Sequence, residues 1–145
     1  MTAAFGTPLI DQTEKALNAI LRLQLAGTGL SEQQWVTLSL IVAAGGTVDG
    51  DELTGRVAGV LKVSNAHARG RITELAAAQL LQPAANDGSR AKLSDAGLRL
   101  HRQVGTAVSG ITERLWGDLA AEDIATAGRI LSTVLERANA ELAEP

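Results

Sequence analysis

Hydrophobic residues recur every three or four positions near both ends of the chain, which is the spacing of one face of an α-helix. The first stripe covers 8–26 and starts at Pro8, a residue suited to the first turn of a helix. A second pattern starts at Ser94, a common capping residue, and runs to an interruption over 118–123. A third pattern then continues to about Leu142. We therefore predict one amphipathic helix at the start of the chain and two at its end.

Shorter helices are predicted in the middle of the chain. The first begins after Ser31, because Ser31 and Gln34 have the spacing of a capping box, in which two side chains satisfy free backbone groups at a helix start. It ends at the glycine pair 45–46. The turn residues 47–50 then lead into a brief helix over 51–61, whose acidic start complements the positive end of the helix dipole.

A fourth helix is predicted from its cap Ser64 to about Gln79. Ile72, Leu75 and Ala76 are expected to face the core, with the polar residues of the helix elsewhere. Together with the brief helix before it, this segment forms a helix-turn-helix pattern.

A small hairpin is predicted over 80–93. Residues 80–85 are short and extended, 86–89 have turn chemistry, and 90–93 can return antiparallel. Pro83 cannot donate a backbone hydrogen bond, so its strand is expected at an edge. The expected fold class is therefore mainly α with a small β-hairpin.

The terminal helices have broad apolar stripes that need a covering partner. The simplest partner for both is the same arrangement in a second copy of the chain. We therefore expect one chain over 1–145, with a central lobe over 31–93 and dimerisation helices over 8–26 and 94–143.

The composition offers little material for an enzyme site. The 145 residues include no cysteine and no tyrosine, and the two histidines, His67 and His101, are far apart in the sequence. No glycine-rich phosphate loop, nucleophile elbow or metal-ligand cluster occurs in the sequence. We expect no enzymatic activity, cofactor or metal. Without a long apolar run or a leader pattern, a cytoplasmic protein with no membrane partner is expected.

Charge is distributed unevenly, although the net charge is only −3. Residues 53–93 carry six basic and two acidic side chains, a local charge of +4, between acidic segments of −4 and −3. Attraction to phosphate is screened within roughly 8–10 Å in physiological salt, so the local sign matters more than the total. The basic middle therefore favours a nucleic-acid partner.

The order of these elements resembles the multiple antibiotic resistance regulator (MarR) family of winged helix-turn-helix proteins. The resemblance is carried by LSEQQWVTL at 30–38, the run 52–64 ending in LKVS, Leu80-Leu81, Asp87 and Arg90, and LSDAG at 93–97. It implies a homodimeric regulator, most simply a repressor, that binds an imperfect palindrome in double-stranded DNA and is released by a small-molecule effector. The lack of cysteine excludes thiol-based sensing.

The resemblance also implies which side chains contact DNA. The fourth helix would enter the major groove, where arginine reads guanine and asparagine reads adenine. The candidates for contacts from this helix are Asn65, His67, Arg69 and Arg71. An ordinary solvated helix face with the same charges is the alternative interpretation.

Phosphate contacts are expected on either side of this helix. Lys62 and Ser64 lie at the turn before it, where free amides and an ammonium favour an anion, although simple capping also explains Ser64. Arg90 and Lys92 in the wing are candidates for phosphate or minor-groove contacts. Asp87 is expected to orient Arg90.

Two departures from the family pattern fall in the DNA-facing part. The interval between Leu81 and Leu93 is about four residues short, and Gly70 stands where an arginine is common. Glycine within a helix costs roughly 1 kcal/mol relative to alanine. It either weakens the helix or permits close approach to phosphate or a neighbouring helix. These departures motivate an alternative function, a winged-helix protein-interaction module that has lost specific DNA binding.

The aromatic residues and histidines have further interpretations. Trp35 is expected in the core, and Trp116 in the core or, as the alternative, lining a pocket. His67 is a DNA contact, a pH-responsive group or an exposed polar residue. His101 is not expected to bind metal, because no second histidine lies near it in the sequence.

Overall fold

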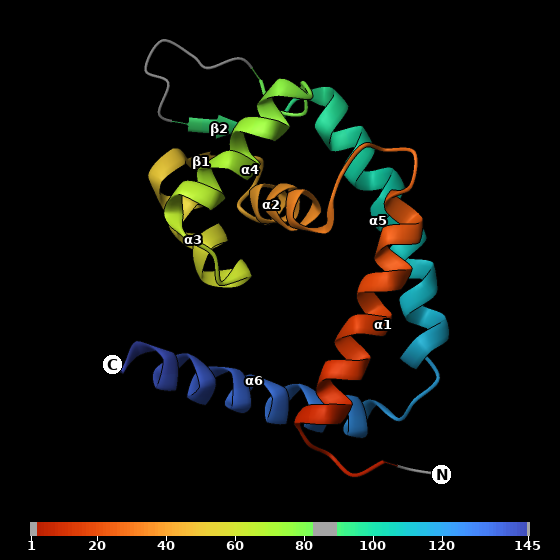
Figure 1. The fold of residues 1–145 in the computed structure, drawn as a ribbon. Helices are drawn as coiled ribbons and strands as arrows, with labels where there is room; N and C mark the ends of the chain where they lie inside the picture. Colours follow the sequence, from red (N-terminus) through yellow and green to blue (C-terminus); the bar gives the residue numbers. More distant parts are fainter. Residues whose placement is uncertain (1–2, 83–89, 145) are drawn as a thin grey trace. The chain divides into compact units, whose positions relative to one another are not determined.

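The computed structural model describes residues 3–82 and 90–144, and nearly all of its regular structure there is helical (Figure 1). The elements are α1 (Thr7–Leu25), α2 (Glu32–Ala43), β1 (Thr47–Asp49), α3 (Gly50–Leu61), α4 (Asn65–Ala77), β2 (Arg90–Lys92), α5 (Asp95–Trp116) and α6 (Ala121–Ala143). The chain divides into one unit that ends at Val108 and a second that begins at Ser109. Helix α5 runs through this boundary, and each unit is described by itself.

The core of the first unit lies among α2, α3 and α4. Its largest fully buried side chains include Leu38 and Ile41 of α2, Leu53 and Val57 of α3, and Leu75 of α4, each at most 1% exposed. Burying one such side chain contributes about 1.5–3 kcal/mol. This shared core holds the predicted helix-turn-helix pattern, α3 followed by α4, against α2.

The three serine caps predicted from the sequence are confirmed. Ser31 and Gln34 form both bonds of a capping box at the start of α2. The Ser64 hydroxyl accepts from the His67 amide at 3.1 Å, and the Ser94 hydroxyl accepts from the Gly97 amide at 3.0 Å. These helix starts form where predicted because their capping bonds join residues three positions apart.

The predicted pairing of 80–85 with 90–93 is found at its described end, but the prediction missed a further strand. Strand β2 pairs antiparallel with β1, in the register Thr47↔Lys92, Val48↔Ala91 and Asp49↔Arg90. The expected partner segment is described up to Gln82, where it pairs with β2 through the bridge Leu81↔Leu93 and a bond of 2.7 Å from the Gln82 amide to the Lys92 carbonyl; residues 83–89 lie outside the described residues. Val48 and Ala91 are both buried, so core packing selects a strand that the sequence presented as a turn.

Strand β1 continues into α3 without a loop. Asp49 is the last residue of β1, and its carboxylate accepts from the Glu52 amide at 3.0 Å, which caps α3. The residues at 47–50, predicted as turn residues alone, therefore serve a strand and a helix cap.

Two predictions of core position are also wrong. Ala76 is exposed, and Ala68 faces the core with Leu75 instead. Positions 68 and 75 are seven apart and share one face of a helix, whereas 76 lies about 100° further round. Trp116, at the end of α5, is 40% exposed, whereas Trp35 packs against the core as predicted.

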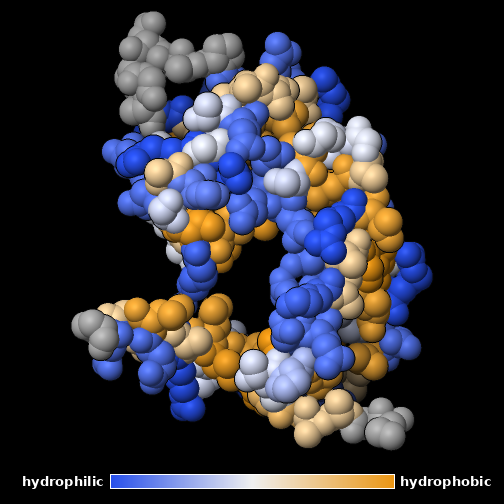
Figure 2. All heavy atoms as spheres, in the orientation of Figure 1, coloured by the Kyte–Doolittle hydropathy of each residue, from blue (hydrophilic) through white to orange (hydrophobic). Residues whose placement is uncertain are grey.

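Helix α6, in the second unit, has no buried residue. Its exposed large apolar side chains are Ile124, Ile130, Leu131, Val134, Leu135 and Leu142. Figure 2 shows apolar side chains gathered along one side of this helix. None of the helices in 3–82 or 90–144 is long and apolar enough to cross a membrane.

The end of α4 and the start of α5 make a close backbone contact. The Leu80 carbonyl accepts from the Ser94 amide at 3.0 Å, and the Ser94 hydroxyl donates to the Gln79 carbonyl at 2.8 Å. Gly97 lies so close to the Leu80 carbonyl that a Cβ atom at position 97 would collide with it. The glycine of the LSDAG run is therefore required for this contact.

We expect Gly97→Ala to destabilise the protein by about 1–3 kcal/mol, because the Leu80 carbonyl is backbone and cannot move aside cheaply. Urea unfolding followed by tryptophan fluorescence measures this. The matched control is Gly55→Ala in α3, where a Cβ meets nothing within 4 Å, and a gain of about 0.5–1 kcal/mol is expected. Equal stabilities of the two variants would contradict the contact.

Candidate nucleic-acid interface

The turn between α3 and α4 is only three residues long and exposes Lys62 and Ser64. Lys62 adopts the left-handed conformation, with φ 59° and ψ 47°, and the amides of Lys62 and Val63 both return to the Ala58 carbonyl. The Lys62 ammonium donates to the Gly59 carbonyl at 2.7 Å. A positive side chain and the capped start of α4 therefore lie at the same turn.

The face of α4 opposite the core carries small residues. Ala68 and Leu75 are buried, whereas Ala66 and Thr73 are exposed on the other side of the helix. At Gly70 a Cβ atom would meet nothing within 4 Å, so no other helix in 3–82 or 90–144 packs closely against it. The close approach of a neighbouring helix at Gly70, one of the alternatives that the sequence left open, is therefore not found among the described residues.

Three of the four predicted contact residues on α4 are exposed: Asn65, His67 and Arg69. Within the described part of the chain, no hydrogen bond or ion pair involves the Arg69 side chain. In Figure 2 the surface over α4 is largely hydrophilic. The helix thus presents hydrogen-bond donors to solvent, as the sequence predicted.

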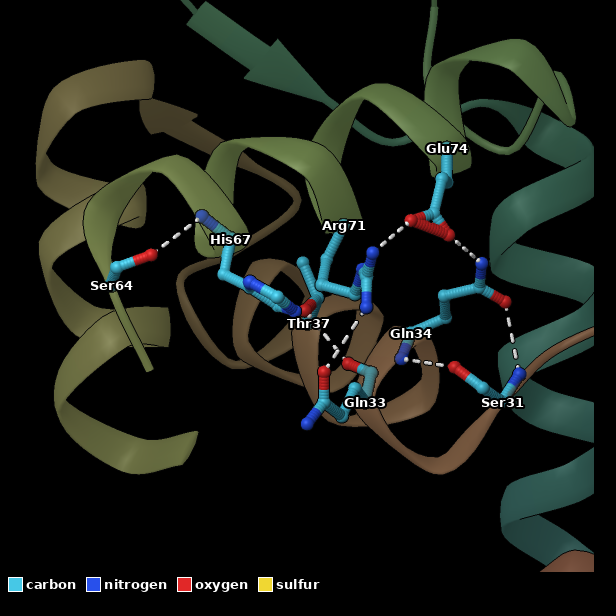
Figure 3. Close-up of polar contacts among 8 residues, drawn as sticks. All are labelled: Ser31, Gln33, Gln34, Thr37, Ser64, His67, Arg71 and Glu74. Carbon is cyan, nitrogen blue, oxygen red and sulfur yellow. Dashed lines mark hydrogen bonds and ion pairs between the residues drawn. The ribbon is translucent and has the colours of Figure 1, made fainter. Parts of the chain in front are cut away.

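Arg71, the fourth predicted contact, is turned toward α2 (Figure 3). Its guanidinium lies 2.6 Å from the Glu74 carboxylate and donates to the Gln33 side-chain oxygen at 3.2 Å. Sequence reasoning missed these partners, although the spacing of Arg71 and Glu74 on one helix was visible. Arg71 therefore has intramolecular partners where a free DNA contact was expected.

The predicted wing residues Arg90 and Lys92 lie on the exposed side of β2. Ala91 between them is buried, so the strand alternates with both basic side chains on one face. Asp87 lies outside the described residues, and its pairing with Arg90 stays a prediction. Strand geometry therefore places two cations side by side next to the helix-turn-helix.

His101 of α5 stacks on Trp35 of α2, with ring centroids 4.7 Å apart and an angle of 11° between planes. Its Nε2 lies 3.2 Å from the Ser39 hydroxyl. Burial lowers the pKa of His101 below its ordinary value, because the charged imidazolium is poorly solvated there. No sequence signal joins residues so far apart, and this contact was not predicted.

Metal binding finds no support in the described residues. No group of three or more His, Cys, Asp or Glu side chains in 3–82 and 90–144 could hold a metal ion.

Comparisons with known proteins give a likeness in fold. No protein-family model matches the sequence, and no curated protein matches it by sequence. NadR in complex with 4-hydroxyphenylacetate is 22% identical, with a TM-score of 0.71 over 90% of this chain and 95% of that one. A MarR-family transcriptional regulator from Rhodococcus sp. RHA1 is 16% identical, with a TM-score of 0.71 over 88% of this chain and 91% of that one.

A third solved structure includes DNA. It is a mutant of MarR from E. coli complexed with operator DNA, 22% identical, with a TM-score of 0.70 over 88% of this chain and 91% of that one. The chain has the MarR fold. The predicted fold class is thereby confirmed, with α3 and α4 as the helix-turn-helix of the MarR fold.

We expect stability to depend on pH through His101. Since burial lowers its pKa in the folded state, the unfolded chain takes up the proton first as pH falls. The contribution of neutral His101 to the free energy of unfolding is complete above the ordinary imidazole pKa of about 6.5 and is lost progressively below it. Urea unfolding at about pH 7.5 and about pH 5.5 should therefore show a smaller loss of stability for His101→Gln than for the wild type.

The control for this experiment is Gln103→Ala, because Gln103 is an exposed residue of the same helix and has no ionisable side chain. It should lose the same stability on acidification as the wild type. An unchanged pH dependence in His101→Gln would show that the stacked imidazole does not contribute.

Proposed function

We propose that the chain is a transcriptional regulator that binds specific double-stranded DNA as a homodimer. One observation carries the proposal: the fold shared with a MarR protein complexed with operator DNA is combined, in this chain, with exposed donors on α4. The local charge of +4 over 53–93 supports it. The predicted domains fit this reading, with a DNA-binding lobe over 31–93.

In this proposal, α4 enters the major groove. Asn65 and Arg69 are exposed near its start, where a recognition helix contacts base edges. Asparagine can make two hydrogen bonds to adenine, and arginine two to guanine. His67 is exposed on the same helix and donates or accepts one bond per ring nitrogen. The small residues Ala66 and Gly70 permit close approach of the helix backbone.

Phosphate contacts come from either side of α4. Lys62 and Ser64 offer an ammonium and a helix start at the turn before it, and Arg90 and Lys92 offer two cations on β2. Such contacts supply affinity without sequence information. They make binding strongly dependent on salt, because each neutralised phosphate releases counterions.

The homodimer covers apolar surface that one chain leaves exposed. The predicted dimerisation helices, 8–26 and 94–143, contain Leu23, Leu131 and Leu135, all exposed in the single chain. A second copy buries such faces by symmetry. Two lobes related by a two-fold axis then read the half-sites of an imperfect palindrome, roughly 34–36 Å apart.

We further infer that the dimer is a repressor released by a small-molecule effector. NadR, which shares the fold, has been solved with 4-hydroxyphenylacetate. An effector releases DNA only if it binds the non-binding state of the protein more tightly.

The first test compares binding to a duplex from the region upstream of the protein's own gene with binding to a scrambled duplex. By fluorescence anisotropy we expect the native duplex to bind about a hundredfold more tightly or better. Log affinity should fall linearly with log salt concentration. Arg69→Ala should reduce the preference by about tenfold or more if Arg69 makes a bidentate base contact.

Arg99→Ala is the matched control, because it removes the same charge from an exposed position on α5. It should leave the preference unchanged. Weak, salt-sensitive binding that is equal for both duplexes would contradict specific recognition and favour the protein-interaction module. Repeating the titration with small aromatic carboxylic acids tests effector release.

A second prediction concerns the dimer. Leu131→Glu places a charge in the apolar stripe of α6 and should convert the dimer to monomer at micromolar concentration in sedimentation velocity. Ala140→Glu adds the same charge on the polar side of α6 and should leave the dimer intact. A monomeric wild type, or a dimeric Leu131→Glu variant, would contradict this interface.

A further inference from the structure

Polar side chains join α4 to the start of α2 in an arrangement that the proposed DNA contacts do not explain (Figure 3). We call it the α2–α4 polar network, formed by Ser31, Gln33, Gln34, Arg71 and Glu74. One terminal nitrogen of Arg71 lies 2.6 Å from a Glu74 oxygen, and the other donates to Gln33 at 3.2 Å. Both ends of the guanidinium are therefore held.

The centre of the same guanidinium is enclosed. The Arg71 Nε atom is buried and has no hydrogen-bond partner among the residues that the structure describes. The Arg71 side chain as a whole is 26% exposed. To reach a DNA base, Arg71 would have to leave two acceptors and expose Glu74 to the phosphates without a neighbouring cation. Its location therefore favours a role within the protein.

Glu74 connects this arginine to the cap of α2. Its second oxygen accepts from the Gln34 amide nitrogen. The oxygen of the same Gln34 amide accepts from the Ser31 backbone amide at 2.9 Å. Since the cap fixes where the amide oxygen points, it also directs the amide nitrogen toward Glu74. The start of α2 and the middle of α4 are thus joined through one glutamine side chain.

A contribution to the stability of the protein does not by itself account for the α2–α4 polar network. Glu74 is 39% exposed, and ion pairs of this exposure contribute little to stability. The bonds are directional, however, and they add fixed polar partners between two helices whose shared core side chains are apolar. The main effect of the network is therefore on the orientation of α4 relative to α2.

We propose that Arg71, Glu74 and Gln34 are positioning residues that set the orientation of α4 on α2 and thereby the sequence preference of binding. This rests on the proposed function. Arg71 acts through Glu74 and does not contact DNA, whereas Arg69, which the network does not include, remains available to the groove. The acidic Glu74 is required on a DNA-binding helix because it holds Arg71 and Gln34 together.

The test is a double-mutant cycle with Arg71→Gln, Glu74→Gln and the double variant, titrated against native and scrambled duplexes over a range of salt. Glu74→Gln removes a negative charge, so electrostatics alone would tighten binding to both duplexes. The network predicts instead that Glu74→Gln binds the native duplex more weakly, so that its preference for the native over the scrambled duplex falls by about tenfold. Arg71→Gln should cause a similar loss, and the double variant should lose no more than about twofold beyond either.

The salt dependence separates positioning from contact. If Arg71 contacted phosphate, Arg71→Gln would reduce the slope of log affinity against log salt by about 1. Positioning leaves that slope unchanged. Glu52→Gln, an exposed glutamate on α3, is the matched control for loss of charge and should not lower the preference. Tighter native binding by Glu74→Gln, additive losses in the cycle, or a reduced slope for Arg71→Gln would each overturn the proposal.

The wild-type titration alone reports on the proposed function. If the wild type shows no preference between duplexes, that function fails and the positioning role fails with it. If the wild type shows the preference but the variants behave additively, only the positioning role fails. Urea unfolding of the same variants confirms that each is folded under the conditions of the titration.

Discussion

The contact between the Leu80 carbonyl and the first turn of α5 is the constraint on which the arrangement of the first unit depends. Two groups of Ser94 bond to carbonyls just after α4, the amide to Leu80 and the hydroxyl to Gln79. Gly97 has no side chain that would keep the Leu80 carbonyl away. Backbone groups in such contact have no rotamers through which to relax. The direction in which α5 leaves the lobe is therefore tied to the end of the helix that carries the exposed donors.

The sequence predicted the features that depend on neighbours along the chain. Capping by Ser31, Ser64 and Ser94 involves bonds between residues three apart, so each helix start could be placed. Strand β1 could not, because three residues are too few to show a period of two and Val48 is selected by its distant partner Ala91. Ala76 was misplaced because one position on a helix moves a side chain by about 100°.

The candidate interface likewise has features that the sequence predicted and features that it did not. Helical periodicity was enough to place Asn65 and Arg69 on the exposed face of α4. It was not enough for Arg71, because Gln33 lies on another helix and nothing in the sequence pairs the two. The stacking of Trp35 on His101 was hidden for the same reason. Side chains with partners on other helices are therefore where prediction from sequence failed.

Asp49 belongs to two elements at once, and this limits how the lobe can deform. It pairs with Arg90 in the sheet register, and its carboxylate caps α3 through the Glu52 amide. With no loop between strand and helix, there is no segment in which a displacement could be absorbed. A displacement of β2 would therefore either break its pairing with β1 or carry the first turn of α3 with it.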